Sequence, residues 1–188
     1  MRSALFALLL TLPLAAALSA CEGDSFLTDA TVVRDSVELA APTATVDLPS
    51  ALDFTNAGAG IALRRPERTE DAQQWDLALR RTETSGFALR TFEAPGQSLR
   101  GAGLSAQASD FEALERAPRN SSDYTTGLIP ISVGNVFAVR SRQYSTGLGF
   151  ACTAFGKLKV VSVDAVAGTA KLAVIANAGC DDERLTAD

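Results

Sequence analysis

Apolar and polar residues alternate with a two-residue period in several short segments of the chain. In residues 75–80, Trp75, Leu77 and Leu79 fall on one side, while Asp76, Ala78 and Arg80 fall on the other. This period is typical of a β-strand that buries one face. Comparable segments, separated by turn residues, occupy residues 43–48, 51–54, 61–65, 86–92, 136–142 and 157–178. Many short strands at near-regular spacing predict an all-β fold, mostly antiparallel and built as a sandwich or curved sheet, with one or two short helices.

A four-residue pattern recurs in residues 61–64, 77–80, 87–90 and 137–140, where two large apolar residues alternate with alanine and arginine. The large apolar residues, with the only tryptophan, form the expected core: Ile61, Leu63, Trp75, Leu77, Leu79, Phe87, Leu89, Phe137 and Val139. The arginines on the opposite face are Arg64, Arg80, Arg90 and Arg140. If these strands are neighbours, that face can receive an anionic ligand group. The alternative is a solvated strand face that keeps the domain soluble.

Two of the three cysteines are brought together by a predicted hairpin. Residues 157–178 read as two β-rich segments around a turn, and opposed residues of an antiparallel hairpin have a constant sum of residue numbers. Pairing Asp164 with Thr169 gives 333, and pairing Cys152 with Cys180 gives 332. Cross-strand neighbours have Cβ atoms about 4.5–5.5 Å apart, so a Cys152–Cys180 disulfide is predicted. The alternative leaves one free, buried cysteine.

One short helix is predicted within residues 109–118. Ser109 stands three residues before Glu112, which is the spacing of a capping box, and Pro118 ends the turn. The segment belongs to a Gly- and Ser-rich excursion from about residue 98 to 130. Loops of this kind are a natural place for binding residues.

The first twenty residues have the character of a secretory signal peptide. Arg2 precedes an apolar run that is broken by Pro13 and is shorter than the roughly 20 residues of a spanning helix. The following "LSAC" resembles the lipobox of bacterial lipoproteins, in which the cysteine, here Cys21, is lipidated. We therefore expect a signal peptide at 1–20, a lipidated N-terminus and tether at 21–42, and a single β domain at 43–188. The alternative is an ordinary signal peptide that leaves Cys21 free.

Charge and lipidation bear on the partners of the domain. The formal net charge of -5 becomes -6 when Arg2 is removed with the signal peptide. An acidic domain does not match nucleic acid, whose binding depends on clustered Lys and Arg. Membrane attachment is expected through acyl chains on Cys21. Glu22, where related lipoproteins retained in the inner membrane carry aspartate, favours the bacterial outer membrane.

The residues that most enzymes use are missing. The chain has no histidine, which excludes a histidine triad, an imidazole base and a histidine metal ligand. With one cysteine lipidated and two paired, no thiolate remains. No metal site is predicted, because "DDE" at 181–183 lacks the spacing of a calcium loop. The remaining enzymatic hypothesis is a hydrolase with two buried carboxylates that face one cleft.

The segment from Trp75 to Leu79 resembles the "WDIAF"-like core strand of the HmuY-type haem-binding lipoproteins. Residues 52–60, 136–142 and 155–169 are similar to further segments of that family in the same order, so the resemblance covers much of residues 45–178. It implies an antiparallel β fold with a side pocket, a non-enzymatic surface-attached binder, and haem as the ligand. It also implies that Trp75 is structural and is buried in the middle of the sheet.

Characterised members of that family hold the haem iron with histidine or methionine, and neither residue remains in the mature chain. Tyr124 and Tyr144 are the remaining candidates, because phenolate can ligate haem iron; otherwise they are ordinary loop aromatics.

Two functions follow from these observations. The first is a lipoprotein that binds haem, or another hydrophobic or anionic molecule, and it predicts an apolar pocket beside residues 98–130. Its candidate ligand contacts are the two tyrosines and three arginines: Tyr124, Tyr144, Arg80, Arg90 and Arg140. The second is a structural or protein-interaction module of the envelope, which predicts a flat surface at the same place.

Overall fold

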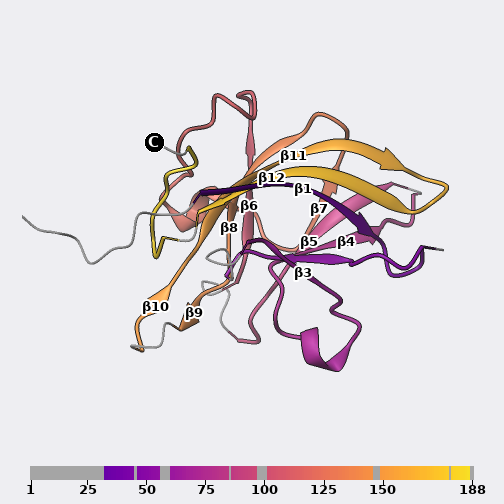
Figure 1. Ribbon diagram of the computed structural model, residues 1–188, viewed down its shortest axis with the longest axis horizontal. Coiled ribbons are helices and arrows are strands. Elements are labelled where there is room, and N and C mark those ends of the chain that lie inside the picture. The colour runs from indigo at the N-terminus through magenta and orange to yellow at the C-terminus, as the bar shows by residue number, and fades with distance from the viewer. Residues whose placement is uncertain are drawn as a thin grey trace, which may run out of the picture.

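The chain forms two antiparallel five-stranded sheets that pack face to face. The computed structural model describes residues 32–44, 46–55, 60–84, 86–96, 101–145, 149–177 and 179–186. Figure 1 shows β1, β11 and β12 along the top of the molecule, with β3, β4 and β5 below them. The predicted all-β, mostly antiparallel sandwich is confirmed. The signal peptide and Cys21 lie outside the described residues.

The two sheets differ in strand length. The long sheet has the order β1 (Val32–Ala40), β12 (Thr169–Asn177), β11 (Phe155–Asp164), β8 (Val136–Arg140) and β6 (Gly103–Gln107). The short sheet has the order β3 (Ala62–Arg64), β2 (Ala51–Asp53), β4 (Leu77–Arg81), β5 (Phe87–Thr91) and β7 (Leu128–Ile131). A small ribbon pairs β9 (Tyr144–Ser145) with β10 (Ala151–Cys152). The helical elements that the structure describes are two 3₁₀ turns, η1 (Thr69–Asp71) and η3 (Ser121–Asp123).

The main hydrophobic core lies between the sheets. Alternate residues of each strand point inward, as the two-residue period requires. The core includes most of the apolar residues expected there, namely Ile61, Leu77, Leu79, Phe87, Leu89, Phe137 and Val139. Leu63 is different: it is 44% exposed, because β3 is a three-residue strand at the edge of the short sheet.

The first strand begins earlier than the sequence pattern indicates. Residues 32–42 were expected in a flexible tether, yet β1 begins at Val32 and pairs along its whole length with β12. Val37 and Leu39 of this strand are buried in the main core. The domain therefore includes residues 32–42.

A second hydrophobic cluster covers the outer face of the long sheet. The excursion contributes Phe111, Leu114, Ala117 and Tyr124, which pack with residues of β8, β11 and β12 and with Leu185. The predicted helix at 109–118 is wrong: residues 111–113 form a turn. The backbone bonds to the C-terminal segment instead, from Ala117 N to Glu183 O at 2.9 Å and from Leu185 N to Glu115 O at 2.8 Å. These tertiary hydrogen bonds occupy backbone groups that a helix would have used.

The predicted disulfide is present. Asp164 pairs with Thr169 as expected, and a bulge between Val160 and Ser162 then changes the constant sum by one, so that Phe155 pairs with Asn177. The sum becomes 332, which is the sum of the two cysteine numbers. Cys152 and Cys180 are bonded, with Cα atoms 5.1 Å apart. The one extra residue of the bulge in β11 therefore accounts for the difference between the sum of 333 at the turn and the sum of 332 at the cysteines.

Candidate functional site

The outer surface of the short sheet carries arginines beside alanines. Strand register places each of three arginines opposite an alanine: Arg64 opposite Ala51, Arg90 opposite Ala78 and Arg80 opposite Ala88. The three alanines are fully buried. We call these six residues the arginine–alanine face. Three of the four recurring patterns therefore lie in one sheet, whereas Arg140 belongs to β8 of the other sheet.

Trp75 covers one end of the arginine–alanine face. Its ring packs with Ala51 and Ala78 and meets Phe92 edge-on, with ring centroids 5.3 Å apart. Its Nε1 donates a hydrogen bond to Ala72 O at 3.1 Å. The expectation that it points inward with the leucines of β4 is wrong, because the chain bends at Asp76 before that strand begins. The single tryptophan thus lies on the outer side of the sheet, where its ring covers Ala51 and Ala78.

Arg64 has acidic partners on this face. Its Nη2 lies 3.0 Å from Asp53 Oδ2, and its Nη1 lies 3.5 Å from Asp71 Oδ1. Arg65, the next residue, pairs with Asp47. These guanidinium groups are therefore neutralised within the protein.

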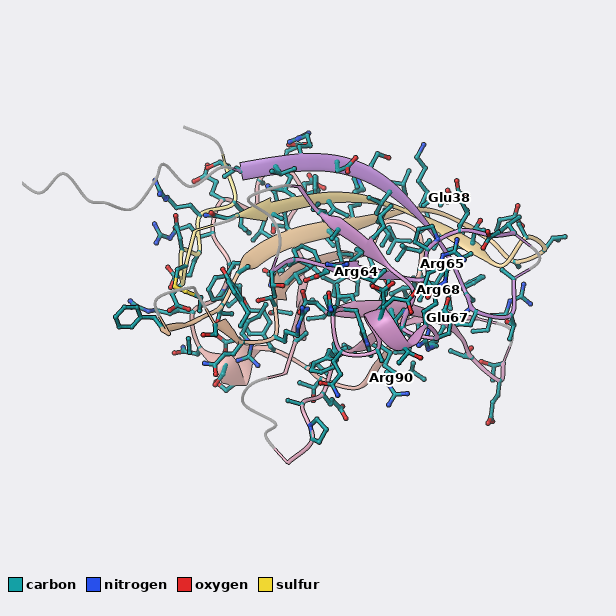
Figure 2. All side chains as sticks on the ribbon, turned by 60° about the horizontal axis from the view of Figure 1, so that its bottom comes forward. Glu38, Arg64, Arg65, Glu67, Arg68 and Arg90 are labelled. Atoms are coloured by element: carbon teal, nitrogen blue, oxygen red, sulfur yellow. A yellow bond between two sulfur atoms is a disulfide. The ribbon has the colours of Figure 1, made fainter. Side chains whose placement is uncertain are left out.

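Arg80 and Arg90 lack such partners. Among the residues that the structure describes, neither forms an ion pair with a carboxylate within 4.0 Å. Arg80 is half-buried, and its Nη1 donates to Leu79 O at 3.0 Å. Burial lowers the pKa of Arg80, nearby Glu67 opposes this, and Arg90 lowers it further. In Figure 2, Arg64, Glu67 and Arg68 lie around β3 and the loop after it, and Arg90 extends from β5 toward solvent.

The chemistry of this pair of arginines is the recognition of an anion. A guanidinium presents five N–H donors in a planar fork, and it binds carboxylate or phosphate oxygens through charge-assisted hydrogen bonds. Glu67 accepts a hydrogen bond from Ser50 Oγ at 2.8 Å, so part of its hydrogen-bonding capacity is occupied. Leu128 of β7 lies opposite Arg90 and is 55% exposed. An anionic group and a small apolar group can therefore be received side by side.

A shallow groove lies beside the excursion, on the outer face of the long sheet. Its volume is about 690 Å³, and five of its eight lining residues are charged: Arg34, Asp35, Ser36, Asp110, Phe111, Glu112, Lys159 and Ala173. Arg34 of β1 forms a two-bond ion pair with Glu112 across it. Phe111 and Ala173 are the apolar residues of its lining, and Ser36 is its uncharged polar residue.

The two tyrosines proposed as haem ligands lie on opposite faces of the long sheet. Tyr124 is buried in the outer cluster, whereas Tyr144 packs against the main core. The hydroxyl of Tyr124 donates to Pro118 O at 2.7 Å, and burial raises the pKa of this phenol. Burial also raises the pKa of Tyr144, and Asp181 and Asp76 add to the effect. The two tyrosines therefore lie in different apolar clusters and are not placed to ligate one haem iron together.

The sequence did not reveal a cluster of buried charges that joins the two sheets. Asp76 is fully buried, and its Oδ1 accepts hydrogen bonds from Arg142 N at 2.7 Å and Arg142 Nη1 at 3.1 Å. Its Oδ2 accepts a bond from Phe54 N at 2.6 Å. Arg142 Nη1 also lies 3.0 Å from Asp53 Oδ1. The only sequence signal was a carboxylate next to the tryptophan, and nothing along the chain linked it to Arg142.

These carboxylates have opposite pKa shifts. Burial raises the pKa of Asp76 to about 6, against the opposing influence of Arg142. Burial also disfavours the ionised form of Asp53, but Arg142, Thr55 and Arg64 together hold its pKa below the ordinary value. Both carboxylates accept hydrogen bonds from protein groups, and neither lines the groove beside the excursion. The cluster has the geometry of a structural link between sheets.

Across the described ranges, no group of three or more His, Cys, Asp or Glu residues is placed to hold a metal ion. Within the same residues, no helix is long and apolar enough to cross a membrane. Comparison with known proteins finds no matching family model, no matching curated protein and no matching solved structure.

Proposed function

We propose that this chain is a non-enzymatic lipoprotein of the bacterial outer membrane, anchored through Cys21, whose β-sandwich binds a ligand with an anionic group. The lipobox-like "LSAC" supports the anchor, and the order of segments similar to the HmuY-type lipoproteins supports a binding role. The binding site is the arginine–alanine face. The observation that carries the proposal is the pair Arg80 and Arg90, diagonal neighbours on β4 and β5 that form no ion pair within 4.0 Å among the described residues.

The environment of Arg80 favours an added anion. Its guanidinium is partly removed from water, and Arg90 repels it. Only Leu79 O accepts a hydrogen bond from it. An oxyanion placed between the two arginines would offset their repulsion and accept several of the unused N–H groups. The exposed Leu128 beside Arg90 extends the site toward an apolar substituent.

The test is a titration of the mature chain, residues 21–188 in detergent, with inorganic phosphate. The fluorescence of Trp75, the only tryptophan, reports on the face that it covers. Hydrogen bonds to charged groups contribute about 1.5–3 kcal/mol, so Arg80→Gln and Arg90→Gln should each weaken binding by about tenfold or more. Arg68→Gln changes an exposed arginine of the neighbouring loop and is the matched control.

Equal affinity in the wild type and in both variants would overturn the assignment of this face. A parallel haemin titration separates haem from other anionic ligands. We expect no saturable Soret change that depends on the tyrosines, because they lie in different clusters and the Tyr124 hydroxyl is bonded to Pro118 O. A Soret change that Tyr124→Phe/Tyr144→Phe abolishes would instead establish tyrosine-ligated haem.

A second candidate function is a protein-interaction module of the envelope. The specific observation in its favour is the charged lining of the shallow groove beside the excursion. Mixed charges with an open shape suit a polar protein surface better than a buried small molecule. Charge reversal at Lys159, Lys159→Glu, would then weaken association with an envelope partner and leave phosphate binding at the arginine–alanine face unchanged.

A further inference from the structure

Among the described strands, β1 is the longest that has an open edge. The two five-stranded sheets end in the edge strands β1, β6, β3 and β7. Three of these are short or covered: β3 has three residues, β7 contains Pro130, and β6 is bridged by Thr125, which exchanges backbone hydrogen bonds with Leu104. β1 has nine residues, and another described segment bonds to its open side only at Ala40, whose N donates to Pro49 O at 2.9 Å. An open edge of this length is a template for pairing with another chain.

The open side of β1 presents the N–H groups of Arg34, Ser36 and Glu38. Successive residues of an antiparallel strand direct their N–H and C=O groups to alternate sides, and Ala40 directs its N–H away from β12. Ser36 agrees with this direction, because its N–H donates to Asp35 Oδ1 at 2.7 Å. The donor in the middle of the open edge is therefore occupied by the side chain of the preceding residue.

Asp35 also places a charge at the end of an apolar row. It lies on the inner side of β1 with Val37 and Leu39, both of which are buried in the main core. Across the sheet the same row continues through Val174 and Leu158, which are fully buried. Asp35 itself is exposed. An inward-pointing charge on an edge strand is one of the devices that prevent edge-to-edge pairing.

The other charges of β1 are self-complementary about Ser36, the middle residue of the strand. Two copies can pair as antiparallel strands about a two-fold axis at Ser36, with both inner faces on the same side. This register sets Arg34 of each copy opposite Glu38 of the other, which is a favourable cross-strand pair. It also sets Asp35 opposite Val37 of the second copy, where pairing would remove the carboxylate from water beside an apolar side chain.

We propose that the open edge of β1 is a pairing surface for a second copy of this chain, and that Asp35 holds it unpaired. The carboxylate acts in two ways: it occupies the Ser36 N–H, and it carries a charge to the place where the apolar row would continue into the second copy. This role concerns the oligomeric state, and it depends neither on lipidation of Cys21 nor on the arginine–alanine face.

The test is analytical ultracentrifugation of the mature chain in density-matched detergent. The wild type should be monomeric. Asp35→Val removes the charge and the acceptor and extends the apolar row, so it should form a dimer where the wild type is monomeric. We expect its dimer dissociation constant to be lower than that of the wild type by about tenfold or more. Glu38→Val is the matched control, since it removes the same charge from the outer face of the same strand; it should stay monomeric.

Amide hydrogen exchange identifies the surface that pairs. In the Asp35→Val dimer, the N–H groups of Arg34, Ser36 and Glu38 should become protected. Arg34→Glu, added to Asp35→Val, sets like charges opposite each other and should return the protein to the monomer. Adding Glu38→Arg to that double variant reverses both charges and should restore the dimer.

The proposal is overturned if Asp35→Val stays monomeric, if the wild type already pairs through β1, or if a dimer forms without protection of the three amides. Asp35→Asn is the second variant, because it removes the charge and keeps an oxygen acceptor for the Ser36 N–H. If Asp35→Val does not fold, stronger pairing by Asp35→Asn than by the wild type supports the proposal. Pairing by Asp35→Asn that equals the wild type overturns it.

Discussion

Arg142 contacts two buried carboxylates at once. Its Nη1 lies 3.0 Å from Asp53 Oδ1 and 3.1 Å from Asp76 Oδ1, and its Nη2 donates to Thr55 Oγ1 at 3.1 Å. Its guanidinium lies 6.0 Å from the centre of the Phe92 ring. Arg142 follows β8 of the long sheet, whereas Asp53 and Asp76 belong to the short sheet and its approach. One side chain thus joins the two layers electrostatically.

We predict that Arg142→Met lowers the free energy of unfolding by about 3–5 kcal/mol near neutral pH, because it leaves two buried carboxylates without their common partner. The measurement is urea unfolding followed by Trp75 fluorescence. Arg119→Met provides the control, since Arg119 forms a single ion pair and is 88% exposed; exposed pairs contribute about 0–1 kcal/mol.

The loss in Arg142→Met should depend on pH. The folded pKa of Asp76, about 6, exceeds the ordinary value of 3.8, so its contribution to stability is fully present below about pH 4 and is lost as pH rises through 6. Arg142 lowers the pKa of both carboxylates. Without it both pKa values rise, and the deficit of the variant should be larger at about pH 7.5 than at about pH 5. A deficit that is equal at both pH values would contradict the electrostatic role.

At the scale of elements, β11 and β12 form the hairpin that carries the disulfide. Cys152 precedes β11 and Cys180 follows β12, so the bond closes the open end of the hairpin across a separation of 28 residues. The bulge in β11 aligns the two cysteines while the inward residues on both sides of it stay in the core.

We predict that Cys152→Ala/Cys180→Ala loses roughly 3–4 kcal/mol of unfolding free energy, as expected for a loop of this length. Urea unfolding of the oxidised wild type and of the variant measures the difference. Wild-type protein treated with dithiothreitol should approach the variant. A loss below about 1 kcal/mol would show that the bond does not constrain the unfolded chain as proposed.

Gly156 of β11 allows Phe54 to reach the core. A Cβ atom at this position would lie 2.6 Å from Phe54 Cε1 and 2.6 Å from Ile175 O. One of these neighbours belongs to the ring of a fully buried phenylalanine and the other to backbone, so neither can move freely.

We therefore predict that Gly156→Ala lowers the unfolding free energy by about 1–3 kcal/mol, the usual cost of overpacking. Denaturant unfolding measures the effect. Gly86→Ala is the matched control, because its added methyl meets only the Thr82 hydroxyl at 3.1 Å. An equal cost at the two glycines would contradict the close approach of Phe54 as the cause.

At the scale of the whole molecule, three layers of apolar contact hold the domain together. The main core lies between the sheets, the excursion and the C-terminal segment cover the outer face of the long sheet, and Trp75 with Phe92 covers part of the short sheet. The proposed anion site, the arginine–alanine face, lies on the outer side of the short sheet. Cys21, the proposed lipidation site, precedes β1, which begins at Val32.

We predict that Cys21→Ser releases the protein from the membrane fraction of a bacterium that processes lipoproteins, since the proposed attachment is through acyl chains on Cys21. Cell fractionation with detection of the protein measures the change. Cys152→Ser is the control, because it should affect the disulfide and leave attachment intact. Membrane retention of Cys21→Ser would contradict lipidation as the anchor.

Local periodicity determined much of this structure. The two-residue alternation placed Leu77, Leu79, Phe87 and Phe137 in the interior, because side chains of a strand alternate between faces whatever the strand pairs with. Hairpin arithmetic depends only on separation along the chain, so it anticipated the Cys152–Cys180 bond. The same alternation placed each arginine on one face with an alanine of its own strand, and strand register then set arginines opposite alanines.

Tertiary structure decided everything that depends on partners distant in sequence. The capping-box spacing at 109–112 gave no helix, because hydrogen bonds to residues 183–185 replaced it. Trp75 lies outside the main core because Asp76 bends the chain to meet Arg142, 66 residues later. Arg80, Arg140 and Arg142 look alike in sequence. Only the fold determines which of these cations is buried, which is paired and which remains available, because burial and counter-ions come from segments far apart along the chain.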